Sequence, residues 1–355
     1  MSISIAGMGW VTPLGTELGA VWEQIARGAA PALKTIANPE TGREHLCAPV
    51  PPSLTEALNR NPRLRRSSPI SYFAVAAGLA ALADAGLSMT PELAARTAVV
   101  FAIGNGGVIY TRRFYEQIVK QGANTASPLL FPETVYNAPA SHLAAQLGID
   151  GASYTLVGDQ SVGLAALKMA EQLIEIGAAD RCVVVGCEEL DWILCEGYRD
   201  WRLAATPARP DRGAILAEGA GALVLAREGR CELRAIHDGV PFFHRAEAGA
   251  ALERAVTDVA SGAPVDLVVS CSNGTFIERI ESEVLARHCA DARVYHPKRS
   301  LGEAPGASAL LQVIAAAQAL ERTGAHSALV PVLGFNQQAS AAVLGRQLDG
   351  VRIVV

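Results

Sequence analysis

The chain has 355 residues, of which half are hydrophobic and 18% are charged, and its net charge is −5. This composition suits a large core, or a core with an extensive apolar subunit interface, and the weak charge argues against a dedicated nucleic-acid binder. No apolar run is long and uncharged enough for membrane insertion, and the seven cysteines show no framework spacing. We therefore expect a cytoplasmic protein with free thiols and no metal.

The first hundred residues alternate strand and helix patterns. Residues 2–9 predict a strand, and the Ala-rich segment 68–86 predicts a helix whose small side chains allow close packing. Between them, the polar, Pro-rich segment 35–61 predicts a surface excursion. A continuous apolar run at 97–103 predicts a buried strand.

A glycine-rich turn, Gly104–Asn105–Gly106–Gly107, opens the next predicted helix. Its spacing departs from the G-x-G-x-x-G pattern at Ile109, so a tight strand-to-helix turn is favoured over a phosphate cradle. In the helix that follows, Val108, Thr111 and Tyr115 fall on one face. Ordinary core packing is one interpretation of that face.

The stretch from 154 to 189 organises the chain. Residues 154–158 predict a short strand, helical spacing then runs to Ile176, and the apolar run 181–186 predicts a central strand covered on both faces. Gln160 therefore lies where a strand leads into the N-terminus of a buried helix. Free N–H groups and the positive end of the helix dipole suit a thiolate nucleophile or an oxyanion there, but an amide offers no nucleophile.

The second half repeats this plan. After an irregular cap at 190–212 and a strand hairpin at 217–226, apolar patterns predict strands at 231–237, 267–270, 293–295 and 328–333, and helices at 245–260, 277–289 and 306–322. The segment 163–186 matches 306–334 in length and apolar pattern, which indicates internal duplication. From these patterns alone, two doubly wound α/β domains would be expected.

The segment around Gln160 resembles the nucleophile segment of the β-ketoacyl synthases, and the opening block IAGMGWVTPLG resembles their first strand and turn. The resemblance covers the whole chain. It implies an α/β thiolase-like fold of two duplicated βαβ-type halves, 1–226 and 227–355, in a five-layered α-β-α-β-α arrangement.

Glutamine at the position of the acyl-accepting cysteine marks chain length factors, the partner subunits of type II polyketide ketosynthases, and also the decarboxylating loading ketosynthases. The short chain and the block FPETVYNAPASHL are most similar to chain length factors of the aryl polyene type.

The resemblance also maps the remaining site positions. An elongating synthase uses a thiolate, two histidines and a lysine; here Asn273 and Glu303 stand at the histidine positions and Lys298 is retained. Of the Gly-Phe-Gly gate only Phe335 remains. Gln160 cannot form a thioester and an ionised Glu303 would repel an enolate, so we expect no catalytic residue. Because an unpaired buried carboxylate is costly, we predict that Glu303 is buried and satisfied by Lys298, Asn273 or Gln160.

Five further residues have competing interpretations. The resemblance makes Val108, Thr111 and Tyr115 candidates for the wall of the polyketide tunnel, with Tyr115 as the largest stopper. His142, on the segment 131–148 that resembles an interface helix, matches no catalytic histidine, and a structural or interface role is favoured. Ser161 lies in a motif without the glycine of a nucleophile elbow, and a simple helix start is favoured.

The predicted function is that of a non-catalytic subunit, inactive alone. It would form a heterodimer with an active ketosynthase and shape the tunnel for a chain carried by phosphopantetheine-linked acyl carrier protein, without a cofactor of its own. One alternative is a glutamine-type malonyl-carrier decarboxylase that primes chain initiation. A homodimeric acyl-binding scaffold is the other.

Overall fold

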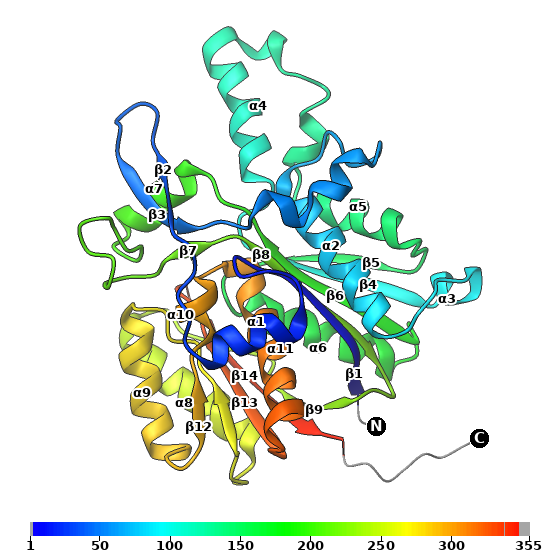
Figure 1. Ribbon diagram of the computed structural model, residues 1–355, viewed down its shortest axis with the longest axis vertical. Helices are drawn as coiled ribbons and strands as arrows, with labels where there is room; N and C mark the ends of the chain where they lie inside the picture. The colour runs from blue at the N-terminus through cyan, green and yellow to red at the C-terminus, as the bar shows by residue number, and fades with distance from the viewer. Residues whose placement is uncertain (1–2, 337, 348–355) are drawn as a thin grey trace.

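A long mixed sheet runs through the molecule (Figure 1). The computed structural model describes residues 3–336 and 338–347, and within these ranges the sheet has eleven strands. Their spatial order is β12 (Arg293–Tyr295), β11 (Leu267–Val269), β13 (Ser327–Leu333), β14 (Gln338–Arg346), β9 (Cys231–Ile236), β1 (Ile3–Val11), β8 (Gly219–Ala226), β6 (Arg181–Glu188), β4 (Thr97–Ile103) and β5 (Ser153–Val157), with β10 (Val240–Pro241) beside β14.

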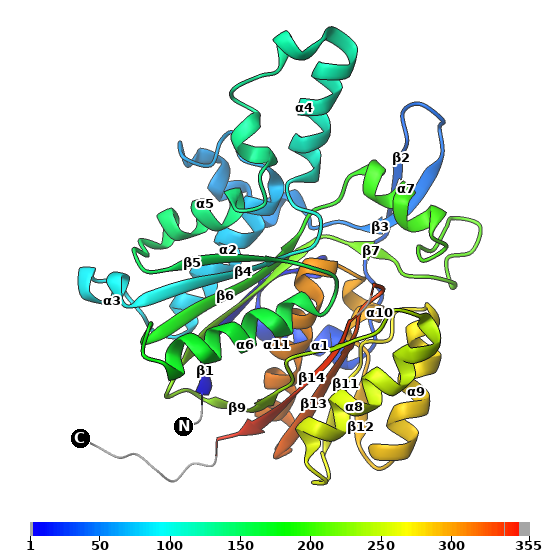
Figure 2. The same ribbon diagram turned by 180° about the vertical axis from the view of Figure 1, so that it is seen from behind.

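Helices cover both faces of each half of this sheet. One core cluster packs α6 (Val162–Glu175) and α11 (Pro305–Thr323) between the two halves. A second cluster packs α2 (Pro69–Asp84) and α5 (Ala138–Leu147) on the outer face of the N-terminal half, and a third packs α8 (Ala248–Ala260) and α9 (Phe276–His288) on the C-terminal half. The layers therefore run α-β-α-β-α, as expected (Figure 2).

The central helix α11 explains the chain's small residues. Every residue from Pro305 to Leu320 is buried, and the helix lies close against β6 and β8. A Cβ added at Gly186 would lie 2.5 Å from the carbonyl oxygen of Gly306, so only glycine permits this approach. Ala-rich helices and buried glycines thus bring segments of both halves together at the middle of the molecule.

The remaining described elements complete the structure. They are α1 (Leu18–Ala26), α3 (Pro91–Ala95), α4 (Val108–Gln121), α7 (Trp192–Asp200), α10 (Pro297–Leu301), β2 (Lys34–Ala37), β3 (Glu44–Ala48), β7 (Leu216–Ala217) and the 3-10 turns η1 (Pro52–Leu54), η2 (Glu56–Arg60), η3 (Ala123–Thr125), η4 (Phe131–Thr134) and η5 (Arg245–Glu247). Along the described chain, no helix is long and apolar enough to cross a membrane.

Four predicted segments differ from the structure. The surface excursion 35–61 contains the β2–β3 hairpin, which together with β7 makes a second, three-stranded sheet. The predicted hairpin 217–226 is instead the single strand β8 of the long sheet, and the short strand β7 before it pairs with β3 in the small sheet. The irregular cap 190–212 contains α7, whose N-cap Asp191 accepts the Ile193 N–H at 3.1 Å. The helix expected over 131–148 is η4 followed by α5, which restarts with Pro139 in its first turn.

Two features leave the N-terminal half open to a neighbour. Strand β5 ends the sheet and pairs only with β4 among the described strands. Helix α4 stands away from the body of the protein in both views (Figures 1 and 2), and none of its residues is buried. The predicted boundary at residue 226 falls between β8 and β9 and stays a prediction.

Candidate functional site

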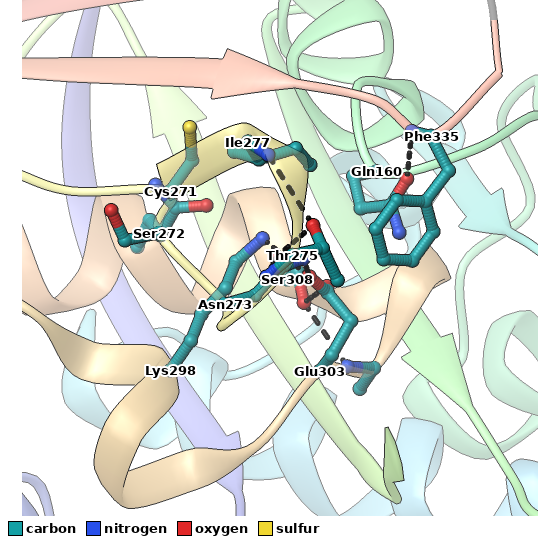
Figure 3. A network of polar contacts seen from close by, with 12 residues as sticks. Gln160, Cys271, Ser272, Asn273, Thr275, Ile277, Lys298, Glu303, Ser308 and Phe335 are labelled. Atoms are coloured by element: carbon teal, nitrogen blue, oxygen red, sulfur yellow. Dashed lines mark hydrogen bonds and ion pairs between the residues drawn. The ribbon is translucent and has the colours of Figure 1, made fainter. Parts of the chain in front are cut away.

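Gln160 occupies the turn between β5 and α6, as predicted. Its side chain is fully buried, and its Oε1 accepts the backbone N–H of Phe335 at 2.9 Å. Its Nε2 has no hydrogen-bond partner within the part of the chain that the structure describes. The amide oxygen therefore occupies the one donor that the Phe335 backbone offers at this turn (Figure 3).

Asp159 fastens the loop between β13 and β14 over this turn. One carboxylate oxygen accepts the Asn336 N–H at 3.0 Å, and the other accepts the hydroxyl of Ser161 at 2.9 Å. A Cβ at Gly334 would collide with the Asp159 carboxylate, which explains the glycine at that position of the loop. Burial raises the pKa of Asp159. This anchoring role was not predicted from the sequence.

Glu303 is the centre of a closed polar cluster. Its carboxylate is 1% exposed and accepts hydrogen bonds from Lys298 Nζ at 2.9 Å, Asn273 Nδ2 at 2.5 Å and Ser308 Oγ at 2.6 Å. The prediction that Glu303 is buried and satisfied by Lys298 and Asn273 is confirmed. Gln160 does not bond to it; that amide turns to Phe335 instead (Figure 3).

Two other side chains, of Thr275 and Glu281, fix the position of Asn273. Its Oδ1 accepts the Thr275 hydroxyl at 2.6 Å, which orients the amide so that Nδ2 points to Glu303. Just before it, the Glu281 carboxylate accepts the Cys271 N–H at 2.7 Å and the Ser272 N–H at 3.0 Å. The loop after β11 is thereby held against α9. The donors of Asn273 and Lys298 are thus directed at a protein carboxylate rather than at a substrate.

An open pocket lies beside this cluster. Its volume is about 620 Å³, and it is lined by Gly104, Asn105, Val157, Gly158, Asp159, Tyr198, Trp201, Leu203, Arg245, Phe335 and Asn336. None of Gln160, Asn273 and Glu303 lines it. The Phe335 ring packs between the rings of Tyr198 and Phe276, with centroids 5.8 and 6.4 Å away. The degenerate positions are therefore closed off behind the pocket wall.

A pair of buried glutamates at the end of β6 was missed in the sequence. Glu188 accepts the Gly306 N–H at 2.9 Å, and Glu189 accepts the N–H groups of Ile70 and Ile109, each at 2.9 Å. Burial raises the pKa of each carboxyl to about 7. They join the start of α11 and the base of α4 to the sheet. Two adjacent acidic residues at the end of a predicted buried strand could have indicated this pair of buried carboxylates.

The candidate tunnel residues lie on the protruding helix α4. Val108 and Thr111 are half-buried at its base, and the Tyr115 side chain is exposed (59%). Ordinary core packing is therefore wrong for Tyr115 in this chain. Arg112 fixes the helix to α7 through two hydrogen bonds of 2.9 Å to the Asp191 carboxylate. Helix α4, called the α4 arm below, is thus fixed at its base and exposes the face that carries Tyr115.

The two residues with favoured structural roles make structural contacts. His142 Nε2 lies 2.7 Å from Glu133 Oε1 and 3.2 Å from the Ser67 hydroxyl, which ties α5 to the segment before α2. The Ser161 hydroxyl bonds to Asp159 and to Gln338, at 2.9 and 2.7 Å, at the start of α6. No histidine bonds to Ser161 in the structure as described, so the hydroxyl lacks the histidine base of a serine triad.

The fold and the site define a class of protein. Residues 1–230 match the family profile described as the β-ketoacyl synthase N-terminal domain. The chain belongs to the β-ketoacyl synthase family.

Two curated relatives show how far the likeness extends. The 3-oxoacyl-[acyl-carrier-protein] synthase 2 of Vibrio harveyi is 26% identical over 237 residues, which are 63% of this chain and 57% of that enzyme. The chain thus matches little more than half the length of that relative. A putative polyketide β-ketoacyl synthase 2 of Streptomyces cyaneus is 27% identical over 353 residues, covering 88% of this chain and 83% of that protein.

Solved structures match over nearly the whole chain. A β-ketoacyl synthase from Burkholderia phymatum has a TM-score of 0.85 at 18% identity, covering 98% of this chain and all of that one. The ishigamide ketosynthase/chain length factor has a TM-score of 0.82 at 21% identity, with 98% and 99% covered. A ketosynthase in complex with its chain length factor from Xenorhabdus doucetiae has a TM-score of 0.77 at 17% identity, with 98% of each covered. These matches establish the thiolase-like ketosynthase fold.

Proposed function

We propose that this chain is a non-catalytic chain length factor. It pairs with an active ketosynthase and supplies part of the wall of the tunnel in which the partner's carrier-bound chain grows. The observation that carries the proposal is the closed cluster around Glu303, which occupies the donors of Lys298, Asn273 and Ser308 within the protein. Two similar solved structures, one of them from Xenorhabdus doucetiae, are described as ketosynthases with chain length factors.

The site offers no step of carbon–carbon bond formation. A primary amide at Gln160 cannot take an acyl group as a thiolate does. Glu303 brings negative charge to a position where a condensing enzyme needs a donor for the enolate, and the loss of one such donor costs about 2.7–4 kcal/mol of transition-state stabilisation. A decarboxylase needs donors for the enolate at the same positions. Because Glu303 already occupies the donors of Lys298 and Asn273, the cluster also disfavours the decarboxylase alternative.

The open edge of the sheet supports a subunit partner. Strand β5 carries an unpaired edge among the described strands, and Tyr154 and Val157 on it are exposed. Exposed apolar side chains continue over the α4 arm and the residues after it: Tyr115, Val119, Leu129, Phe131, Val135 and Tyr136. An unprotected edge beside such a patch invites aggregation unless another chain covers it. An obligate partner would bury more than ~2,000 Å² in total.

The α4 face gives a location for control of chain length. Val108, Thr111 and Tyr115 run from the base of the arm outward, and a partner seated on β5 would cover them. The Glu189 carboxylate accepts the Ile109 N–H, and Arg112 bonds to Asp191. These two contacts fix the orientation of this face of α4. In the proposed heterodimer, the bulk of Tyr115 limits the depth of the tunnel.

Substitution of Tyr115 by alanine tests this proposal in the heterodimer. We expect the chain to co-purify with a ketosynthase that has an intact cysteine and both histidines, and we expect Y115A to give a longer product because the tunnel deepens. Product length by mass spectrometry is the measurement, with Lys120→Ala, an exposed polar position on the same helix outside the apolar patch, as the control. Recovery of two separate soluble proteins would contradict the partnership, and an unchanged product length would remove Tyr115 from the tunnel.

A further inference from the structure

A separate hollow, which we call the β6–β8 hollow, opens where strand β6 begins and strand β8 ends. It has a volume of about 410 Å³ and is lined by Ala6, Ala85, Leu87, Asp180, Arg181, Ala226, Arg227 and Glu228. This volume lies in the range of small-molecule sites in proteins. Strand β6 starts here at Arg181 and ends eight residues later at Glu188, so a strand of roughly 25 Å separates the hollow from the candidate site.

Arg181 is the lining residue that most needs a partner. Its side chain lies on the α2 face of the sheet, as do those of Val183 and Val185 further along β6. The residue is half-buried, its Nε is fully buried, and along residues 3–336 and 338–347 this nitrogen has no hydrogen-bond partner and the guanidinium has no ion pair. Because a buried donor without a partner is costly, an acceptor from outside the chain would stabilise this arrangement.

The other charged side chains of the hollow differ in how they are paired. Arg96, next to the hollow, donates two hydrogen bonds of 2.7 and 3.3 Å to the Asp180 carboxylate. Arg227 donates to a backbone carbonyl in the last turn of α6 at 2.9 Å. Glu228 is exposed and forms no ion pair among the described residues. Arg181 and Glu228 therefore bring opposite charges to one hollow without pairing with each other.

The rest of the lining is aliphatic and lies at the end of a helix. Helix α2 ends beside the hollow, and its C-cap residue Ala85 is part of the lining. The C-terminal end of a helix carries a partial negative charge, which favours a cation there, as the Glu228 carboxylate does. Ala6, Leu87 and Ala226 supply an apolar wall between the charged groups. The hollow thus offers a guanidinium, a negative region and a small apolar surface to one ligand.

We propose that the β6–β8 hollow binds an α-amino acid with an aliphatic side chain. Arg181 binds its carboxylate, Glu228 and the end of α2 attract its ammonium group, and its side chain packs on the apolar wall. A simple anion would leave Glu228 without a counter-charge, and a simple amine would leave Arg181 without an acceptor, whereas a zwitterion satisfies both. This site goes beyond the proposed function and does not depend on it, because neither β5 nor α4 lines the hollow. A partner seated on those two elements would leave it open to an effector.

Calorimetric titration of the full-length chain with L-leucine tests the proposal. We expect one saturable site with a Kd below about 1 mM. Two analogues each lack one charge: 4-methylpentanoate has no ammonium group, and 3-methylbutylamine has no carboxylate. Each is expected to bind at least about tenfold more weakly, the effect of one lost charge-assisted contact. Glycine keeps both charges but lacks the aliphatic side chain, and it is also expected to bind at least about tenfold more weakly.

Two variants locate the site. Arg181→Gln and Glu228→Gln are each expected to weaken L-leucine binding about tenfold. Since Glu228 is exposed, its variant keeps the fold and decides the question even if the Arg181 variant fails to fold. The matched control is Glu175→Gln, an exposed glutamate of α6 outside the lining, which is expected to change nothing.

Three results would overturn the proposal. The first is the absence of saturable L-leucine binding. The second is equal affinity for L-leucine and 4-methylpentanoate, since the hollow would then recognise a carboxylate alone. The third is an unchanged affinity in E228Q, which would place the amino acid elsewhere on the chain. None of these results bears on the pairing with a ketosynthase, so the proposed function would stand or fall by its own test.

Discussion

Replacement of Glu303 by alanine is expected to lower the free energy of unfolding by about 3–5 kcal/mol, the usual cost of removing one partner from a buried ion pair. The variant leaves the Lys298 ammonium buried without its counter-charge, and it deprives Asn273 and Ser308 of their shared acceptor. Urea denaturation followed by circular dichroism provides the measurement.

Two further variants show that the effect comes from the cluster. The double variant Lys298→Met with Glu303→Met removes both charges, and we expect it to lose less stability than E303A alone. Glu283→Ala removes an exposed ion pair with Arg279 and is expected to cost no more than about 0.5 kcal/mol. If E303A were as stable as E283A, the carboxylate would not be the buried centre of the cluster, and the account of the closed site would be wrong.

Replacement of Thr155 by proline is expected to weaken the heterodimer about 10- to 100-fold. Along β5, the Ala152 carbonyl and the Gly158 N–H bond to β4, so even-numbered residues direct their backbone groups to β4 and odd-numbered residues direct theirs to the open edge. Proline at 155 therefore removes a donor from the open edge while the β4 pairing is kept. An unmade buried hydrogen bond costs about 1–3 kcal/mol, and each 1.4 kcal/mol is tenfold in affinity.

The control keeps the backbone donor and removes only the side chain. Thr155→Ala is expected to associate with nearly native affinity, because its N–H remains. Analytical ultracentrifugation of the co-expressed subunits measures both variants. Equal association by T155P and T155A would mean that the partner does not pair with β5, and the interface would have to lie elsewhere.

Many of the buried elements could be predicted from the sequence, because continuous apolar runs and helical spacing depend on burial alone. The continuous apolar runs gave β4 and β6, and helical spacing that stops at a glycine gave α6. The elements that were missed lack such a pattern in their sequences. Strand β14 is buried but was not predicted, because its sequence QASAAVLGR mixes polar and apolar side chains, and β2 of the β2–β3 hairpin is mostly exposed.

The candidate site shows a similar division. Burial and pairing of Glu303 followed from the cost of an unpaired carboxylate, and the structure confirms them. That Gln160 lies near Phe335, 175 residues away, follows from the family resemblance and from no spacing in the sequence. Ser308 was missed because a serine in the first turn of a helix gives no hint of the side chain it bonds to.

The central claim is that this chain cannot itself carry or condense an acyl group. Its most direct test is intact-mass spectrometry of the purified chain after incubation with acyl- and malonyl-loaded carrier protein, in the absence of a ketosynthase. The account predicts an unmodified mass and no elongated product, because Gln160 offers no nucleophile and Glu303 occupies the donors beside it. An acyl adduct on the chain together with an elongated product would contradict it.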